Sequence, residues 1–455
     1  MPPARLLVMP LLVAGTVHAA DPILEPPDGL PLNYRPIPVG TWAPLEGGAY
    51  VARASDSEAG WHNPAGLALS DHGSVSGNTA LFEYVSLEVS RGDAHTSENT
   101  FLQVPSLVGT AFQLTPESER NWVLGAYLAT PNSWAQEVSL GARYPDGANT
   151  VDLSLESRSS SLTIVPGLAV GWRLDDTRRL GFGLEVSYTG FESIRTVNKR
   201  TGDALGNPVE RSFQAESFSA DVYQMQFTGG FQWEINDRWS IGIAARSPSF
   251  ELYDKGRIRL DSFFDNSTFT ADGVFAEDNL NVSIQNPWEL SLAAAYHAER
   301  WDLELLLRGY GGIGNETIID VNNPFIITVT DKSTSTTSTI SNPVNDPVAT
   351  RDFTIVLAIG GRYHMSESWA LHSGLQLNPS PVNAEESTTF READLLSLAF
   401  GTSRTSDHVD TTFGIILTAG SNPNSPETDL TNDATVTSDF RLLITTLVFG
   451  TTYRF

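Results

Sequence analysis

Alternating apolar and polar positions run to the last residue of the chain. Leu443, Phe449 and Tyr453 share one face of an extended segment ending at Phe455, because successive strand side chains point to opposite sides. The other face is more mixed and includes Arg454. The segment therefore separates an apolar environment from a wetter one. This pattern is typical of the strand that closes a bacterial outer-membrane barrel, the alternative being an edge strand of a soluble sandwich.

The same alternation recurs in pairs of segments joined by short polar turns. Apolar residues from Trp288 to Tyr296 alternate with small and polar ones, a short turn follows, and the pattern resumes at Trp301. Residues 353–364 and 369–377 repeat it. Aromatic residues flank these turns, as a membrane-interface girdle requires, because an amphipathic ring is most stable at headgroup depth. A soluble sandwich gives no reason for this placement.

Counting the connections gives the topology. The six short turns are Thr115–Arg120, Asp175–Arg179, Asn236–Arg238, Ala298–Arg300, Ser366–Ser368 and Arg404–Asp407. The seven longer polar connections are Arg91–Asn99, Pro131–Ser160, Thr196–Arg211, Leu252–Leu280, Gly314–Val348, Ser380–Ala393 and Ser421–Ser438. We therefore predict an all-β fold, a 14-stranded antiparallel transmembrane β-barrel, with short turns facing the periplasm and long loops facing outward.

Two of the long connections have a biased composition. The tract Asp331–Ile340 reads DKSTSTTSTI and lacks the apolar residues that would order it, so we expect a solvated loop there. The stretch Asp261–Asp278 is acidic with interspersed phenylalanines. We expect it to be solvated as well; in the alternative interpretation, a hydrophobic entrance is capped by Phe263, Phe264, Phe269 and Phe275.

The chain begins like an exported protein. Arg5 precedes an apolar run that ends near Val17, and small residues follow, so residues 1–20 are predicted to be a signal peptide. No later stretch reaches the roughly 18 apolar residues of a transmembrane helix. The absence of cysteine excludes disulfides and thiolate metal sites. With 54 acidic against 28 basic residues, the chain lacks the basic surface that nucleic acid binding needs.

Residues 21–72 lack sustained alternation and precede the predicted barrel, residues 73–455. The segment up to Pro44 is rich in proline, which favours extended chain without ladder bonds. Turn signals follow at Gly47-Gly48 and Asn63-Pro64. The segment is too small to bury a core of its own. We therefore expect an N-terminal extension followed by a hatch inside the barrel.

The run GGAYVARASDSEAGWHNPAGLALS at residues 47–70 resembles the N-terminal hatch of the FadL-type outer-membrane transporters. Its hatch motif comprises Asn63, Pro64, Ala65 and Gly66. Residues 104–131, 164–186, 244–258 and 451–455 are similar to further segments of that family. The resemblance implies a barrel plugged by a hatch, which carries long-chain fatty acids or other hydrophobic compounds from an outer groove to an inner pocket.

The resemblance also implies a kink in the third strand that opens a sideways exit. The third strand is predicted at residues 121–130, and Gly125 and Pro131 would suit an interruption of its ladder. Both residues also suit an ordinary strand followed by a loop. Within the hatch motif, we expect the Asn63 side chain to tie the backbone and Pro64 to fix φ.

Inward-facing charges are the candidate ligand contacts. A substrate carboxylate would favour a buried cation, because an unpaired anion in an apolar cavity is destabilised. The candidates are Arg173, Arg246, Arg308 and Arg362. Pairing with lumenal acids is the alternative, in a network with Glu289, Asp302 and Glu304. No metal-binding or cofactor motif is present; a serine–histidine pair built around His364 or His372 stays a disfavoured alternative.

The sequence thus favours a passive transporter of the bacterial cell outer membrane. Its expected partners are small hydrophobic molecules such as fatty acids and hydrocarbons. A general diffusion porin, a surface adhesin or phage receptor and, last, an enzyme are the alternatives. We expect a monomer that contacts outer-membrane lipid and lipopolysaccharide and that meets the barrel-assembly machinery during biogenesis. We expect no cofactor, no nucleic acid partner and no catalytic activity.

Overall fold

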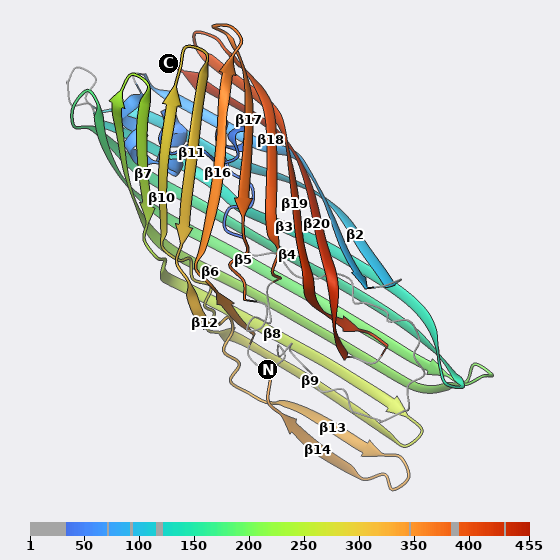
Figure 1. The fold of residues 1–455 in the computed structure, drawn as a ribbon. Helices are drawn as coiled ribbons and strands as arrows, with labels where there is room; N and C mark the ends of the chain where they lie inside the picture. Colours follow the sequence, from blue (N-terminus) through green and yellow to red (C-terminus); the bar gives the residue numbers. More distant parts are fainter. Residues whose placement is uncertain are drawn as a thin grey trace.

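Fourteen strands close into an antiparallel barrel in the computed structural model, which describes residues 33–70, 72–91, 94–114, 122–344, 347–383, 391–431 and 434–455. The barrel strands are β1 (Ser74–Arg91), β2 (Ala94–Gln113), β3 (Trp122–Asp146), β4 (Asn149–Arg173), β5 (Arg178–Gly202), β6 (Pro208–Asn236), β7 (Trp239–Arg246), β10 (Glu289–His297), β11 (Trp301–Tyr310), β16 (Thr354–His364), β17 (Trp369–Asn378), β18 (Asp394–Thr405), β19 (Val409–Asp429) and β20 (Ala434–Arg454). Each pairs with the next in this order, and β20 pairs with β1 (Figure 1). The predicted barrel is confirmed. The proposed signal peptide and residues 21–32 lie outside the described residues.

The two faces of the barrel follow the period-two pattern of the sequence. On β20, Leu443 and Tyr453 are about half exposed on the outer wall, at 47% and 51%, whereas Thr446 and Thr452 are buried in the lumen. Aromatic side chains pair across strands beside the short turns, with ring centroids 4.6 Å apart for Trp301 and Tyr363. The apolar side chains are therefore on the surface that a bilayer would cover.

The predicted outer loops are largely strand, which corrects the sequence interpretation. The third strand does not stop at residue 130: β3 continues to Asp146 and pairs with β4 along most of that length. β5 and β6 likewise extend through most of Thr196–Arg211, and β19 and β20 through most of Ser421–Ser438. Strands β1 and β2 cover most of Arg91–Asn99. The predicted number of fourteen barrel strands is still correct, because these extensions lengthen existing strands and add no new barrel strand.

A further sheet is built on the outer extension of β6. Its strands are β8 (Phe250–Asn266), β9 (Phe269–Leu280), β13 (Phe325–Asp331) and β14 (Thr337–Asn342), paired in that order from β6. A separate pair comprises β12 (Ile313–Thr317) and β15 (Val348–Arg351). The DKSTSTTSTI tract is solvent-exposed, as expected, but it forms the tip of the β13–β14 hairpin and not an irregular loop.

The four phenylalanines of this region do not share one environment. Phe275 is buried against Phe325 in an apolar cluster of the outer sheet, and Phe264 stacks on Phe269 at 5.3 Å beside the same cluster. Phe263 is 40% exposed. Because adjacent strand residues point to opposite faces, Phe263 and Phe264 lie on different sides of the sheet.

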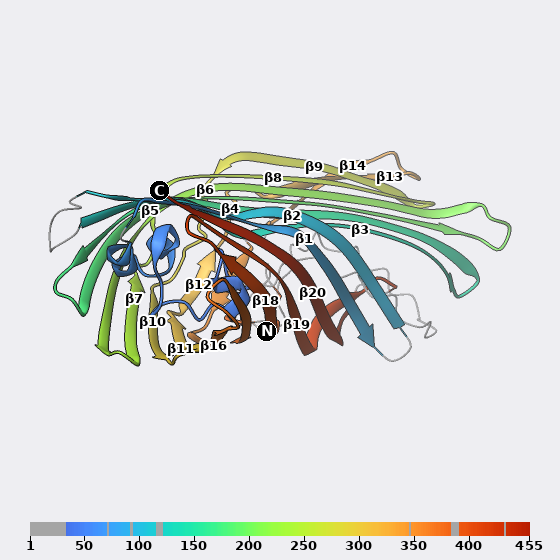
Figure 2. The ribbon, with the colours of Figure 1, turned by 90° about the horizontal axis from the view of Figure 1, so that it is seen from above.

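The hatch consists of four short helical turns inside the barrel. They are η1 (Ala43–Glu46), η2 (Asp56–Glu58), α1 (Ala59–His62) and η3 (Pro64–Leu69). The first contacts β16 to β19, the second β1 to β3, and the last β3 to β6, so strands surround the hatch on all sides (Figure 2). Within the described residues, no helix is long and apolar enough to cross a membrane.

Candidate functional site

The hatch lies directly on the barrel wall because glycine lines the wall where the two meet. A Cβ on Gly360 would lie 2.0 Å from the Glu46 carbonyl oxygen, a distance no real contact allows. Four other wall glycines approach the hatch nearly as closely, namely Gly181, Gly230, Gly242 and Gly374. The wall therefore forms a seat into which the hatch backbone fits without intervening side chains.

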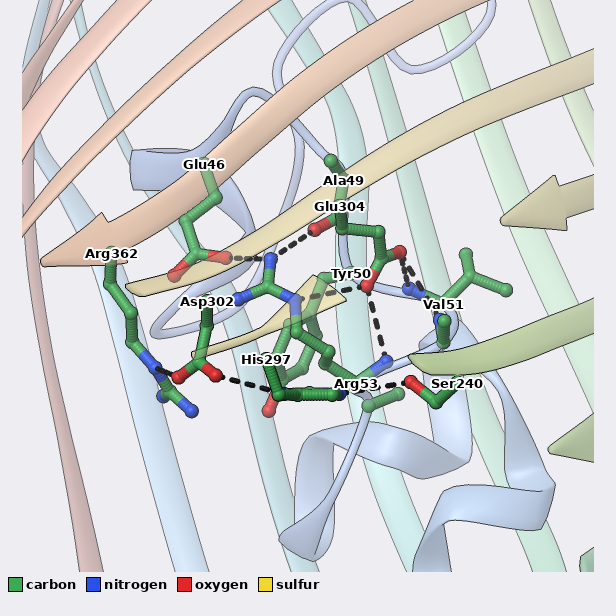
Figure 3. Close-up of polar contacts among 12 residues, drawn as sticks. Glu46, Ala49, Tyr50, Val51, Arg53, Ser240, His297, Asp302, Glu304 and Arg362 are labelled. Atoms are coloured by element: carbon green, nitrogen blue, oxygen red, sulfur yellow. Dashed lines mark hydrogen bonds and ion pairs between the residues drawn. The ribbon is translucent and has the colours of Figure 1, made fainter. Parts of the chain in front are cut away.

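One carboxylate on the wall holds the backbone of the hatch. Glu304 of β11 accepts hydrogen bonds from the backbone N–H groups of Val51, Ala52 and Arg53, at 2.5, 3.1 and 3.1 Å, and from Arg53 Nε at 3.2 Å (Figure 3). Both side chains of the ion pair are almost fully buried. A charge-assisted hydrogen bond is about twice as strong as a neutral one, so these four bonds together form a strong polar link between wall and hatch.

The Arg53 guanidinium continues the link inside the hatch. It pairs with Glu46, whose other oxygen meets His372 Nδ1 of β17 at 2.9 Å. Burial alone would raise the pKa of Glu46, but the charges and hydrogen bonds of Arg53 and His372 lower it to about 2. Glu46 is therefore ionised at neutral pH, and the chain Glu304–Arg53–Glu46–His372 ties the hatch to two wall strands.

The hatch motif makes a third contact with the wall. The Asn63 side chain donates to the carbonyl oxygens of Val51 at 2.9 Å and Phe231 at 3.2 Å, and its Oδ1 accepts from Ala65 N at 3.2 Å. Pro64 starts η3 at the position where a missing N–H is harmless. Asn63 is fully buried. The Asn-Pro-Ala segment thus joins two turns of the hatch to β6.

The inward arginines predicted from the sequence are engaged by protein groups. Arg246 of β7 pairs with Glu185 at 3.1 Å and Glu289 at 3.2 Å, donates to the Trp61 carbonyl oxygen, and lies 4.5 Å from the Trp61 ring centre. Arg308 contacts Glu289 at 3.3 Å, Arg362 contacts Asp302 at 2.8 Å, and Arg173 donates to Ala68 O at 3.1 Å. Whether any of them also touches a ligand stays a prediction.

Sequence reasoning missed the basic residues of the hatch and of the segment that leads into it. Arg53 is one, and Arg35 is the other: it pairs with Glu289 at 2.8 Å and lies 4.7 Å from the Trp61 ring centre. Trp61 is thereby placed against two guanidinium groups. The available signal was an arginine in a short plug expected inside the barrel, where an unpaired charge would be strongly destabilising.

Within the part of the chain that the structure describes, two serine–histidine–carboxylate chains occur in the lumen. His297 bridges Ser240 at 3.0 Å and Asp302 at 2.8 Å, and Asp302 also meets His364 at 2.9 Å (Figure 3 shows Ser240, His297 and Asp302). His372 bridges Glu46 and Ser403, with its side chain fully enclosed. Among the described residues, no group of three or more His, Cys, Asp or Glu side chains is arranged to hold a metal ion.

Buried titratable groups also pack the hatch internally. Burial raises the pKa of Glu58 to about 7, although its hydrogen bond from Thr41 N at 2.6 Å acts the other way. Burial, followed by the charges of Arg35 and Arg308, lowers the pKa of His62 to about 3. His62 is therefore neutral at pH 7, with Nε2 placed 3.0 Å from Val39 O.

Two cavities flank the N-terminal segment that leads into the hatch. The larger, about 1,090 Å³, is lined by Tyr34, Trp61 and Tyr310 together with the Arg35 and Arg246 side chains. The smaller, about 810 Å³, is mainly apolar; its lining includes Ile37, Val39, Trp134, Leu442 and Ile444. Segment 33–39 lies between them, because its first three residues line one cavity and the next four line the other.

Pro131 and Asn132 of β3 line both cavities. The β3–β4 register shifts between Ala129 and Asn132, where one strand carries an extra residue, and the β2–β3 pairing ends at Leu107 and Ala129. Gly125 lies within the regular ladder, and a Cβ there would meet Leu67 of the hatch at 2.9 Å. The irregular part of β3 is therefore at Pro131, six residues beyond Gly125 and beside both cavities.

The sequence model of a family described as outer membrane protein transport protein (OMPP1/FadL/TodX) matches residues 44–455. No curated protein matches the chain. Solved structures with a similar fold include a Pseudomonas aeruginosa FadL homologue, at TM-score 0.55 and 12% identity over 94% of this chain and 99% of that one.

Two further structures have similar folds. The Pseudomonas putida toluene transporter TodX has a TM-score of 0.52 and 14% identity, over 95% of this chain and 99% of that chain. The CymD monoaromatic hydrocarbon channel has a TM-score of 0.53 and 12% identity, over 92% and 97%. At such identities the likeness concerns the fold alone.

Proposed function

Because the chain belongs to the OMPP1/FadL/TodX family of outer-membrane transport proteins, we propose that it carries hydrophobic compounds passively through its hatch-plugged barrel. The observation that supports this most is the pair of cavities beside the hatch, one of them mainly apolar, inside a barrel whose outer wall is apolar. An apolar molecule leaving water for such a cavity gains roughly 25 cal/mol per Å² of buried surface. Movement down a gradient then needs no cofactor.

For the route, we propose that the compound passes from the larger cavity to the smaller one and leaves sideways at the β3 irregularity. Pro131 and Asn132 border both cavities, and among the described residues the β2–β3 pairing does not continue beyond Ala129. Two strands that part on one side leave a gap in an otherwise closed wall. Gly125 would leave room for the Leu67 side chain of the hatch, and it would not itself be the interruption of the strand.

Long-chain fatty acids and monoaromatic hydrocarbons are both candidate cargoes. The family's name includes FadL and TodX, and similar structures carry the descriptions toluene transporter and monoaromatic hydrocarbon channel. For cellular context we propose export by the signal peptide at residues 1–20, insertion by the barrel-assembly machinery, a monomeric state, and contact with lipopolysaccharide. The exposed apolar wall supports the membrane location on which these assignments rest.

Uptake of a radiolabelled hydrocarbon or fatty acid into cells that express the full chain tests the proposal. Uptake should rise above that of cells carrying an empty vector and should fail to concentrate the compound, because transport is passive. A general porin differs in carrying ions, so planar-bilayer recordings separate the two. A large, steady current with no effect on hydrophobic uptake would refute the proposal, as would uptake unchanged by expression.

A further inference from the structure

Each cation that lines the larger cavity is paired with a carboxylate of the protein, although Glu289 is shared by Arg35, Arg246 and Arg308. Among the described residues these cations are Arg35, Arg246 and Arg351. Arg35 pairs with Glu289 at 2.8 Å, Arg246 with Glu185 at 3.1 Å, and Arg351 with Glu316. A ligand carboxylate would have to compete with these buried carboxylates for each guanidinium, so the cavity offers an anion little that is not already engaged.

Neutral hydroxyl groups form one wall of the same cavity. Ser161 and Thr163 of β4 line it, and β5 contributes Ser187 and Thr189 beside them. Thr163 and Thr189 share one hydrogen bond, with 3.1 Å between their oxygens. A hydroxyl can donate once and accept twice, so this pair keeps capacity for a further partner. The wall is therefore suited to hydrogen-bond an uncharged polar group.

The smaller cavity, which the proposed route enters next, also disfavours an anion. Its described lining contains Glu83 but no lysine or arginine. Glu83 is 8% exposed and bonds only loosely to Thr446, at 3.5 Å. An anionic headgroup would therefore find no cation to pair with among the described lining residues, and an unpaired anion in an apolar cavity is destabilised. An apolar body would instead contact Ile37, Leu442 and Ile444.

We propose that the preferred cargo is an uncharged amphiphile, an apolar body with a single hydroxyl or carbonyl group, that binds with this group at Thr163 and Thr189. The inference rests on the proposed transport function and names its substrate class. A carboxylate and a plain hydrocarbon are then the poorer ligands, because the first meets no free cation and the second leaves the hydroxyl wall without a partner.

The test compares three ligands that share one chain: 1-dodecanol, dodecanoate and dodecane. Binding of each radiolabelled compound to the full chain in lipid nanodiscs is measured at pH 8, and retention by empty nanodiscs is subtracted. The test variant Thr163→Val/Thr189→Val removes the hydroxyl pair and keeps the side-chain shape. The control Ser397→Ala/Thr418→Val removes another lumenal hydroxyl pair, more deeply buried and 2.8 Å apart on β18 and β19, that lines neither cavity.

We expect the unmodified chain to bind dodecanol about 5-fold more tightly than dodecane, the effect of about one net hydrogen bond, and more tightly than dodecanoate. The test variant should lose that preference through weaker dodecanol binding alone, and the control should keep it. Tighter binding of dodecanoate, or a preference that survives in the test variant, overturns the inference while leaving transport intact. Failure of all three ligands to bind, with no uptake, overturns the proposed function as well.

Discussion

Replacing Glu304 by glutamine should release the hatch without dismantling the barrel. The carboxylate accepts four hydrogen bonds, two at each oxygen, from the backbone of residues 51–53 and from Arg53 Nε. Glutamine has nearly the same shape, but one of its terminal atoms is an NH₂ group that cannot accept. Whichever way the amide turns, two buried donors lose their acceptor.

The magnitude follows from these contacts. A buried donor without an acceptor costs about 1–3 kcal/mol, and breaking one partner of a buried ion pair costs about 3–5 kcal/mol. The two figures describe the same contacts and do not add. We therefore expect hatch packing to lose about 3–5 kcal/mol, which corresponds to an opening equilibrium raised roughly 10²- to 10⁴-fold.

Hydrogen exchange measures this directly. The N–H groups of Val51, Ala52 and Arg53 point at Glu304, so they exchange only when that end of the hatch leaves its seat. In the Glu304→Gln variant, exchange of peptides covering these residues should accelerate about 10²-fold or more. Planar-bilayer recordings of the same protein should show brief openings.

Glu316→Gln is the matched control. Glu316 is also a buried carboxylate, paired with Arg351 and accepting from Gln285 N at 2.7 Å, but it belongs to β12 and makes no described contact with the hatch. Its substitution should leave hatch exchange unchanged. If Glu304→Gln keeps slow exchange at residues 51–53 in a folded barrel, then Glu304 does not hold the hatch and the reasoning fails.

Three further predictions concern the hatch. Gly360→Ala should displace it by placing a Cβ 2.0 Å from Glu46 O, at a cost of about 1–3 kcal/mol, while Gly229→Ala, with no atom within 4 Å, should be harmless in the same exchange assay. Asn63→Asp turns a carboxylate toward the Val51 and Phe231 carbonyls; thermal unfolding followed by exchange should show the hatch, not the barrel, weakened by about 1–3 kcal/mol. His62 is protonated near pH 6.5 when the hatch is released, but only near pH 3 when the hatch is packed. The contribution of neutral His62 to packing is therefore fully present above pH 6.5 and declines as pH falls toward 3. The His62→Gln variant should not show that decline. Glu58 has a raised pKa of about 7, so its contribution to packing is lost as pH rises from about 4.5 to 7, in the unmodified chain and in the variant alike. The diagnostic quantity is therefore the difference in hatch exchange between the two proteins at each pH.

The sequence predicted the parts of the strands that lie in the bilayer. It misjudged their solvent-exposed extensions, which were expected to be loops. Lipid-facing positions such as Leu443 and Tyr453 must be apolar, which leaves a clear period of two. Beyond the bilayer that requirement ends: Arg143 and Asp152, paired across β3 and β4, are both exposed, so the stretch looks like a polar loop. The opposite face of these extensions is apolar, because Val151, Leu153 and Leu155 alternate with exposed residues and are buried in one cluster. That alternation was present in the sequence, but the charged and polar residues between these positions concealed it.

The residues of the site also fall into those that local sequence patterns predicted and those that only the folded barrel brings together. Alternation placed Glu304 on the inward face, and the Asn63 motif marked the hatch, because both signals are local. The partner of Glu304 could not be found in this way. Arg53 lies 251 residues earlier in the chain, and only the closed barrel brings the two together. The irregularity at Pro131 was visible as a proline, but its place beside both cavities depends on the packing of segment 33–39.

The barrel wall and the hatch differ in what stabilises them, and this difference allows the hatch to be held in place without contributing to the closure of the barrel. The barrel closes through its own ladder, β20 on β1, without any residue of the hatch. The hatch depends on the wall for its stability: glycines admit its backbone, and Glu304, Arg246 and Gln232 bond to it. In this enclosed setting each polar bond is worth more than in water, so a few of them suffice. Substitutions in the seat should therefore change gating while barrel stability stays the same.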